Sequence, residues 1–427
     1  MLGNHHTRIL LLELLLGGIV LGKRLQNMLA AYRDVAVLTL IALPLGVLVG
    51  AVCAVFGRAL LAVTDIRMEH AGWLLPFLGV IGTGIVWCYR KFGGQSGKGM
   101  SLIFEAGHGE AADIPLRLVP FTIAGTWLTH LFGGSAGREG VAIQIGGTIA
   151  HALGKRLPMQ NGRKLLLVTG MAAGFAGLFQ TPIAATFFAL EVLTVGMLEH
   201  KALLPALAAS FAASYTSNLL GLEKFSFALD TDVSFSWMLV LQLLLLGISF
   251  GAAGGLFSLC LHKMKKWLSG KMHNPMLRIL VAGTAIGGLS LLFWNGRYAG
   301  LGTNLISMSF DTGIFPWDFA LKLLFTVVTL SAGFQGGEVT PLFSIGASLG
   351  VVLAAALGLP APFVAALGYA AVFGSATNTF IAPMLIGAEV FGFSYLPYFV
   401  VVCALAYVCN GNLSIYPLQR RKDQSGL

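Results

Sequence analysis

Long apolar segments separated by short polar breaks make up most of the sequence. The runs with no charged residue or only one are Val35–Phe56, Trp73–Cys88, Trp237–Leu261, Ile279–Trp294, Val351–Phe373 and Phe393–Cys409. Because a helix that spans a bilayer needs about 20 mainly apolar residues, this pattern predicts an all-α, polytopic membrane protein. An earlier run, Ile9–Leu21, is shorter and contains Glu13. We therefore expect a retained membrane-surface helix within residues 1–32 rather than a cleaved signal peptide.

The composition supports a membrane protein and affects how the net charge is interpreted. Hydrophobic residues make up 56% of the 427 positions and charged residues 11%, against about 25% charged residues in soluble domains. The net charge of +9 does not indicate nucleic-acid binding, because the basic residues lie in short hydrophilic breaks without interleaved aromatic residues. These breaks are Lys23–Arg33, Arg90–Lys98, Lys155–Lys164, Lys263–Lys271 and Arg420–Lys422. The positive-inside rule assigns them, and both termini, to the cytoplasm.

No residue pattern points to a metal, a cofactor or a disulfide framework. The five cysteines lie in or beside apolar segments without a C-x-x-C pair, so we expect buried thiols. His130 and His151 stand alone, without the spacing of a metal site. No cytosolic regulatory domain follows the last apolar run before Leu427, which leads us to expect a bacterial inner membrane.

The sequence repeats itself at a shift of about 200 residues. Gly170–Glu191, GMAAGFAGLFQTPIAATFFALE, aligns without a gap on Gly368–Glu389, GYAAVFGSATNTFIAPMLIGAE. Upstream matches at nearly the same shift are Ser135-Ala136-Gly137 with Ser331-Ala332-Gly333, Glu139 with Glu338, and Ile145-Gly146 with Ile345-Gly346. The chain is therefore predicted to contain two homologous halves, residues 33–230 and 231–427.

Each half contains a glycine-rich break followed by an apolar, helix-like segment. The two breaks are GGSAGREG, Gly133–Gly140, and SAGFQGGEVTP, Ser331–Pro341; a third, Gly93–Met100, precedes another apolar segment. Helices that begin inside a membrane present free N–H groups and a partial positive charge, which bind anions without a full cation. Paired broken helices in duplicated halves are typical of transporters with a site at the repeat interface. We therefore expect an anion as the substrate.

Glu139 and Glu338 lie at the starts of the two helices that follow the matched breaks. An ionised carboxylate there competes with an anion for the same donors. A protonated one leaves or donates a hydrogen bond, so anion and proton movement become linked, and the two groups would titrate as a pair. The alternative is structural, with each glutamate capping its helix and favouring the N-terminal dipole.

From about Arg33 to Tyr416 the chain resembles the CLC family of anion channels and proton-coupled exchangers. The motif GREG, Gly137–Gly140, carries the most specific similarity and implies that Glu139 is the gating glutamate; GGEVTP, Gly336–Pro341, resembles the family's GxFxP element. Tyr416 falls where a C-terminal tyrosine contacts the central ion. The resemblance implies a homodimer in the lipid bilayer. It also implies an inverted-topology repeat whose broken half-membrane helices meet at a central anion site in each subunit.

Three departures from the chloride-type pattern resemble the bacterial branch that exports fluoride in exchange for protons. Met100 replaces the anion-contacting serine, Glu338, Val339 and Thr340 fill the variable places of GxFxP, and Val192 replaces an intracellular proton-relay glutamate. Fluoride is the strongest hydrogen-bond acceptor among the halides, so a protonated Glu338 and the Thr340 hydroxyl can replace its hydration. The resemblance implies Glu139 and Glu338 as gating and coupling residues, and an anion-binding set of Met100, Gly140, Val141, Val339, Thr340 and Tyr416. Phe104 and Phe343 are candidates for phenylalanine edges along the path.

Other assignments stay open at this point. A chloride/proton exchanger or a passive anion channel would have the same fold. An intramembrane enzyme would need a nucleophile with a base, or an H-E-x-x-H pair; neither is evident, so we expect no enzymatic activity. Glu191 and Glu389, at equivalent ends of the repeated block, are expected to cap helices or bind backbone between the halves. Arg138 is expected to bind loop carbonyls, with an electrostatic benefit for anions.

Overall fold

The computed structural model describes residues 3–110, 113–156, 162–231, 233–234 and 236–421, and the side chains of residues 3–27, 30 and 31 lie outside the description. Within the described residues, six helical segments are long and apolar enough to cross a membrane. They are Tyr32–Glu69, Ala71–Gly107, Gly162–Phe179, Trp237–Lys271, Pro275–Leu292 and Val339–Leu357. The prediction of an all-α, polytopic membrane protein is confirmed.

The first half of the chain runs from α1 to α9. Its helices are α1 (Gly3–Glu69), α2 (Ala71–Leu74), α3 (Leu78–Cys88), α4 (Met100–Gly107), α5 (Leu118–Leu131), α6 (Glu139–Gly154), α7 (Gly162–Phe179), α8 (Pro182–Glu191) and α9 (Leu203–Leu219). The second half contains α10 (Trp237–Lys271), α11 (Pro275–Leu292), α12 (Thr303–Phe310), α13 (Asp318–Ala332), α14 (Val339–Leu357), α15 (Ala361–Thr377), α16 (Ile381–Phe391) and α17 (Leu396–Val408). A short parallel pair, β1 (Thr194–Val195) and β2 (Arg420–Arg421), ties the C-terminal segment to the first half.

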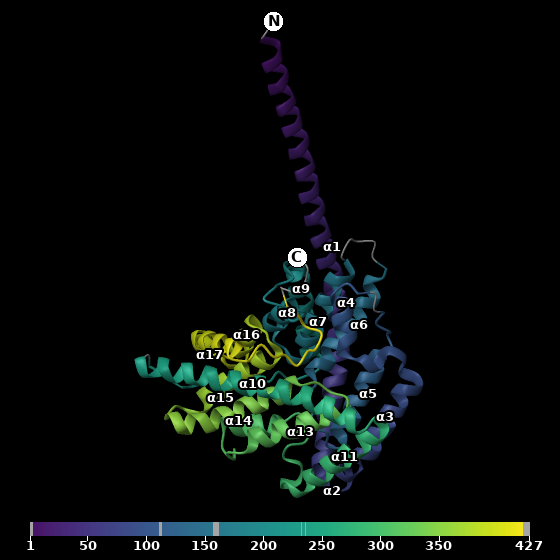
Figure 1. Cartoon of the computed structure of the whole chain (residues 1–427), viewed down its shortest axis with the longest axis vertical. Coiled ribbons are helices and arrows are strands. Elements are labelled where there is room, and N and C mark those ends of the chain that lie inside the picture. The colour runs from purple at the N-terminus through teal and green to yellow at the C-terminus, as the bar shows by residue number, and fades with distance from the viewer. Residues whose placement is uncertain (1–2, 111–112, 157–161, 232, 235, 422–427) are drawn as a thin grey trace.

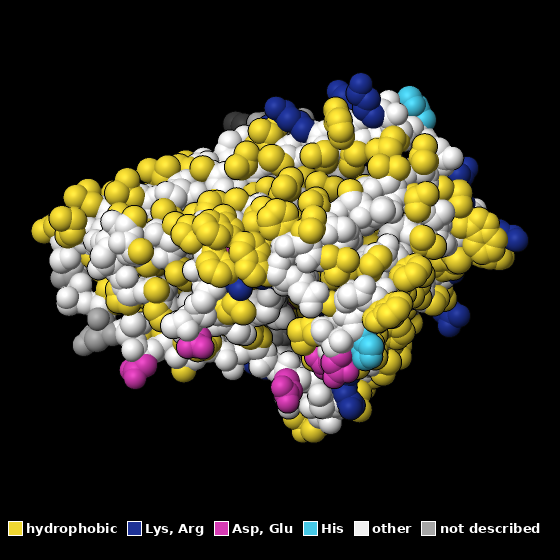
Figure 2. All heavy atoms as spheres, turned by 90° about the horizontal axis from the view of Figure 1, so that it is seen from below, with side chains coloured by type: hydrophobic (Ala, Val, Ile, Leu, Met, Phe, Trp, Pro, Cys, Tyr) yellow, Lys and Arg dark blue, Asp and Glu magenta, His cyan; other side chains and the backbone are white. Residues whose placement is uncertain are grey.

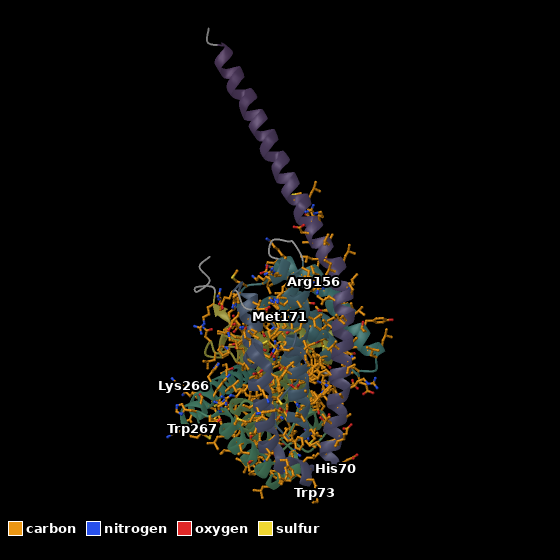
Figure 3. The ribbon with its side chains drawn as sticks, turned by 90° about the vertical axis from the view of Figure 1, so that its right-hand side faces the viewer. His70, Trp73, Arg156, Met171, Lys266 and Trp267 are labelled. Atoms are coloured by element: carbon orange, nitrogen blue, oxygen red, sulfur yellow. The ribbon has the colours of Figure 1, made fainter. Side chains whose placement is uncertain are left out.

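Helix α1 is continuous, so no break separates the predicted element 1–32 from the first span. Its N-terminal part projects away from the helical body, and the C-terminal end of the chain lies on the same side (Figure 1). Arg156, in the basic break after α6, is also at this end, whereas His70 and Trp73 lie at the opposite one (Figure 3). Both termini therefore share one side of the body with a basic loop. The compartment that they face stays a prediction.

One predicted apolar run does not form a single helix. Val351–Phe373 is long enough for one span, but the chain turns within it, because α14 ends at Leu357 and α15 begins at Ala361. Gly358 caps α14 in the left-handed region at φ +66°, which a residue without Cβ adopts readily. Pro360 precedes α15 and cannot continue the hydrogen bonding of the helix before it. Hydrophobicity hid this turn because apolar residues lie on both sides of it.

Two equivalent helix pairs form the most extensive packing in the described chain: α6 with α7, and α14 with α15. In the first pair Gly146 and Gly170 lie against each other, and in the second Gly346 and Gly368 do so. A Cβ at any of these positions would collide with the facing backbone or small side chain, and small residues allow such close helix crossings in membrane proteins. The positions that match between the halves are therefore their helix crossing points.

Hydrophobic side chains also cover much of the molecular surface. In Figure 2 they spread over most of the visible face, and charged side chains lie mostly along its margins. Large residues such as Trp237, Leu292 and Val408 have 79%, 81% and 74% of their surface exposed. Extensive exposed apolar surface indicates contact with a membrane or a partner. This agrees with the six helical segments that are long and apolar enough to cross a membrane.

Candidate anion site between the two halves

The two glycine-rich breaks pair with each other in the middle of the protein. Gly137 and Gly337 form an antiparallel bridge, with N···O distances of 2.5 and 2.8 Å in the two directions. A Cβ at Gly337 would stand 3.0 Å from the amide nitrogen of Gly140, so glycine permits this close approach. The bridge brings the N-termini of α6 and α14 together, as the repeat predicts.

The Glu139 carboxylate binds across this junction to the other half. Glu139 is the first residue of α6 and has no exposed surface. Its Oε2 accepts hydrogen bonds from the Thr340 backbone N–H (3.1 Å) and from the Thr340 hydroxyl (2.5 Å), both in the first turn of α14. The Arg138 N–H donates to the same oxygen at 3.3 Å. A carboxylate therefore occupies helix N-terminal donors, which are a ready site for any anion.

Glu338 lies at the N-cap of α14 and faces a cavity of about 180 Å³ beside this junction. A Cβ at Gly140 would stand 3.8 Å from both Glu338 Oε2 and Met100 Cε, so these three predicted residues are close neighbours. Met100, the last residue of the third break, begins α4, and Gly99 before it lies in the left-handed region at φ +52°. The structure thus brings the third predicted helix start to the same place as the other two.

Tyr416 completes the lining of the cavity from the C-terminal segment. Its side chain is buried, and its hydroxyl has no hydrogen-bond partner among the described residues. The ring packs on Phe104, with the centroids 5.1 Å apart, and Phe104 lines the same cavity. The hydroxyl is therefore a free donor beside Glu338, as expected of a group that contacts a bound anion.

Residues 81–411 match the family model described as voltage gated chloride channel. This chain belongs to the CLC family. A relative from Pseudomonas syringae pv. tomato, named chloride/fluoride channel protein, is 36% identical to this CLC protein over 382 residues, which cover 87% of this chain and 84% of the relative. The crystal structure of a CLC-type fluoride/proton antiporter has 54% identity and a TM-score of 0.90, over 91% of this chain and 99% of that one. A slow cyanobacterial Cl⁻/H⁺ antiporter, at 22% identity and a TM-score of 0.77, shares the fold over 87% of this chain and 94% of that one.

Five predicted site residues do not line the cavity of this CLC protein: Glu139, Val141, Val339, Thr340 and Phe343. Val141 and Val339 are buried in the hydrophobic core, and the Val141 N–H donates to the Arg138 carbonyl at 3.1 Å. Phe343 stacks on Tyr369 with centroids 4.0 Å apart, within the aromatic core rather than at the cavity. Contact of Val141, Val339, Thr340 and Phe343 with an anion stays a prediction.

Several polar residues that sequence reasoning missed line the cavity. They are Lys98, Gln144, His262, Lys265 and Gln335. Gln144 donates to the Gly140 carbonyl at 3.3 Å, and its Oε1 has no partner in the described structure. Because Gln144 is a polar residue within the apolar sequence after Glu139, the sequence could have indicated that this side chain faces a polar cavity. Lys265 had no such signal, because only the packing of the long helix α10 brings it to the cavity.

The two glutamates of the repeated block cap each other's helices. Glu191 accepts the N–H groups of Phe380 and Ile381 at 3.1 Å and of Ala382 at 2.8 Å, at the start of α16. Glu389 accepts two N–H groups at the start of α8, at 3.2 and 2.7 Å. The predicted structural role at the interface of the halves is confirmed.

The prediction that Arg138 binds loop carbonyls is wrong. Its guanidinium forms no hydrogen bond to a loop carbonyl among the described residues, and Nε and Nη1 have no hydrogen-bond partner there. Instead Nε lies 3.7 Å from Glu139 Oε1. The guanidinium at the N-cap of α6 thus lies beside the carboxylate of the first helical residue. Among the described residues, no group of three or more His, Cys, Asp and Glu is arranged to hold a metal ion.

Proposed function

We propose that this CLC protein is a secondary-active antiporter that exports fluoride in exchange for protons, without enzymatic chemistry. The observation that carries the proposal is the docking of the Glu139 carboxylate on two donors of Thr340 at the start of α14. A carboxylate that holds the N-terminal donors of a buried helix competes with any anion that needs those donors. Glu338, which faces the cavity on the adjoining side, is the second acidic group of the path.

The exchange cycle follows from this competition. While Glu139 is ionised, it occupies the Thr340 donors and closes the end of α14 to anions. When a proton binds to Glu139, the negative charge is lost and the carboxyl group leaves α14. An anion from the cavity beside Glu338 then takes the donors. Release of the anion and of the proton to opposite sides restores the docked carboxylate, so the two ion movements are thermodynamically coupled.

Fluoride is favoured by the chemistry of the donors near the cavity. A protonated Glu338, the Thr340 hydroxyl and the free Tyr416 hydroxyl are hydrogen-bond donors, and hydrogen bonds to a charged acceptor are about twice as strong as neutral ones. Val192 is buried and carries no titratable group, which leaves proton handling to Glu338. Similarity to a protein named chloride/fluoride channel protein and to a fluoride/proton antiporter structure supports this choice.

A chloride/proton exchanger or a passive anion channel on the same fold is the second candidate. The name of the Pseudomonas relative includes both halides, and both alternatives use the same helix N-termini. The exchanger differs from the first proposal in its preferred anion, and the channel differs in moving anions without protons.

We further propose that the protein forms a homodimer in a bacterial inner membrane, with both termini cytoplasmic. The placement of both chain ends and of a basic break on one side of the body supports the shared orientation of the termini (Figures 1 and 3). The division at residues 33–230 and 231–427 is supported by the matching helix pairs and by the reciprocal caps from Glu191 and Glu389. Residues 1–32 are proposed to form a cytoplasmic helix that continues into the first span.

Flux measurements in proteoliposomes test the proposed function. An inward proton gradient should drive fluoride out of the vesicles against its own gradient, with chloride transported more slowly. Glu139→Gln, which stays neutral, should move fluoride without protons. Uncoupled flux in the unmodified protein would support the channel, and faster chloride than fluoride movement would support the chloride exchanger. The absence of anion flux in both proteins would reject transport on this fold.

A further inference from the structure

A fully buried lysine contacts the segment Gly133–Arg138 that precedes the gating glutamate. Lys322, in α13, has no exposed surface. Its Nζ donates to Ser135 Oγ at 2.9 Å and to the carbonyls of Tyr298 at 3.1 Å and Gly300 at 2.8 Å. An ammonium group has three N–H donors, so these contacts satisfy it completely.

This arrangement is costly as a means of stabilising the fold. Asp318, the carboxylate nearest in sequence on α13, pairs with Arg297 instead of Lys322. The burial of a charge carries a large desolvation penalty, and well-packed hydrophobic residues often replace buried charges without loss of stability. The contacts of the lysine are therefore best explained by what they hold in place.

The lysine joins a loop of the second half to the break of the first half. The loop Arg297–Gly302 follows α11, and its Gly300 N–H donates to the Gly134 carbonyl at 3.0 Å. The Ala136 N–H donates back to the Gly300 carbonyl at 3.2 Å, the same oxygen that accepts from Lys322. The ammonium group thus supports the point at which the loop pairs with the segment that leads to Glu139.

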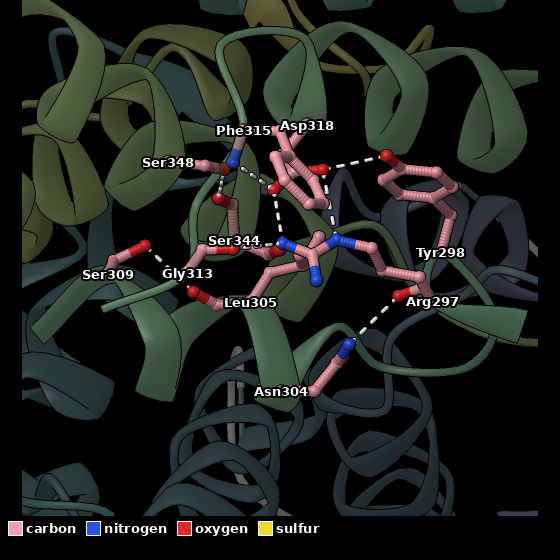
Figure 4. A network of polar contacts seen from close by, with 10 residues as sticks. All are labelled: Arg297, Tyr298, Asn304, Leu305, Ser309, Gly313, Phe315, Asp318, Ser344 and Ser348. Atoms are coloured by element: carbon pink, nitrogen blue, oxygen red, sulfur yellow. Dashed lines mark hydrogen bonds and ion pairs between the residues drawn. The ribbon is translucent and has the colours of Figure 1, made fainter. Parts of the chain in front are cut away.

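The outer side of the same loop is held by Asp318, one turn before Lys322 on α13. The Arg297 guanidinium binds both carboxylate oxygens of Asp318, with Nε–Oδ1 at 3.1 Å and Nη2–Oδ2 at 2.6 Å, and the Tyr298 hydroxyl donates to Oδ1 at 2.7 Å. Figure 4 shows Arg297 and Tyr298 converging on this carboxylate. The loop is therefore bound to α13 at two points one helical turn apart, Asp318 and Lys322.

Arg67, near the end of α1, lies close to Gly300 of the same loop. Its Nη1 donates to the His130 carbonyl at 3.1 Å, and a side chain at Gly300 would collide with its guanidinium. Gly300 has φ +64°, so a residue with Cβ would be unfavourable there on both counts. Side chains of both α1 and α13 therefore lie next to Gly300.

We propose that Lys322 is a positioning residue, which fixes Gly133–Arg138 against the loop Arg297–Gly302 so that Glu139 docks in register on Thr340. The proposal rests on the proposed function, because the docked carboxylate is what couples anion to proton. Without the lysine, the segment moves relative to α14 and the carboxylate closes the anion path less completely. Anions then pass without proton exchange.

Coupling measurements on four variants test the proposal. Lys322→Met retains the length of the side chain and removes its donors, and we expect the number of protons per fluoride to fall about twofold or more. Lys322→Arg retains donors and charge and should restore most of the ratio. Ser135→Ala removes one acceptor and should lower the ratio less. Lys266→Met, on the exposed side of α10 (Figure 3), is the matched control and should leave it unchanged.

The outcomes separate positioning from a general structural role. If Lys322→Met lowers fluoride and proton flux equally, with the ratio unchanged, positioning is overturned. Amide hydrogen exchange in residues 133–138 is a second readout that does not depend on transport; it should accelerate in Lys322→Met relative to exchange in the α6–α7 pair. If the unmodified protein proves uncoupled, the proposed function fails, and exchange alone then decides the role of the lysine. If Lys322→Met does not fold, Ser135→Ala carries both tests.

Discussion

The Thr340 hydroxyl provides the sharpest test of the docked carboxylate. Thr340→Val removes the hydroxyl that donates to Glu139 Oε2 at 2.5 Å and leaves the backbone N–H donors of Thr340 and Arg138 in place. A hydrogen bond to a charged group contributes about 1.5–3 kcal/mol. Its loss should reduce the ratio of docked to undocked Glu139 by about 10-fold to 150-fold.

Proteoliposome flux converts this change into a measurement. An undocked carboxylate leaves the N-terminus of α14 open, so Thr340→Val should leak fluoride down its gradient with fewer protons per fluoride than the unmodified protein. Thr340→Ser retains the hydroxyl and serves as the matched control, with a ratio close to the original. The reasoning is refuted if the valine and serine variants have the same ratio at measurable flux, because the hydroxyl would then have no part in closing the path.

Three further predictions concern the scaffold and the cavity. Glu191→Gln weakens a carboxylate cap on three N–H groups of α16, and the expected loss of about 1–3 kcal/mol should lower the Tm in detergent; an unchanged Tm would argue against the cap. Gly368→Val would force a branched side chain against the Gly346 backbone and should abolish monodisperse protein on size exclusion. Gly288→Val, with open space around the site, should elute normally, and equal behaviour of the two would contradict the crossing geometry. Tyr416→Phe removes a hydroxyl without a partner in the described structure, so the Tm should be unchanged while the fluoride KM rises about fivefold; an unchanged KM would exclude the hydroxyl from the anion path.

The repeated pattern made the central part of the fold predictable from sequence. Glycines at matching positions of the two halves lie at helix crossing points. Gly146 contacts Gly170 in the first half, and Gly346 contacts Gly368 in the second. The two breaks proved to be neighbours through the bridge of Gly137 and Gly337. Both results have the same physical cause, because only glycine permits two backbones to approach so closely. Such glycines can be identified in the sequence by their repetition at matching positions.

Features that depend on tertiary packing were not predictable in this way. The turn between α14 and α15 was hidden because hydrophobicity is continuous across Gly358. Lys322 and Gln144 lie inside apolar segments. Lys322 bonds to Ser135 from a distant part of the chain, and Gln144 lines a cavity that forms only when α4, α6, α10 and the C-terminal segment pack together. The sequence pointed to Glu139 and Glu338 as a pair, but it could not predict that Glu139 binds the helix of the other half.

The central claim is that the Glu139 carboxylate and the transported anion compete for the donors at the start of α14. Calorimetric titration of fluoride into the purified protein at a series of pH values tests it most directly. Where Glu139 is ionised, one proton must bind for each anion, so the affinity of the unmodified protein should fall about tenfold per pH unit. Glu139→Gln should bind fluoride more tightly and lose this part of the pH dependence. The same pH dependence in both proteins would contradict the account.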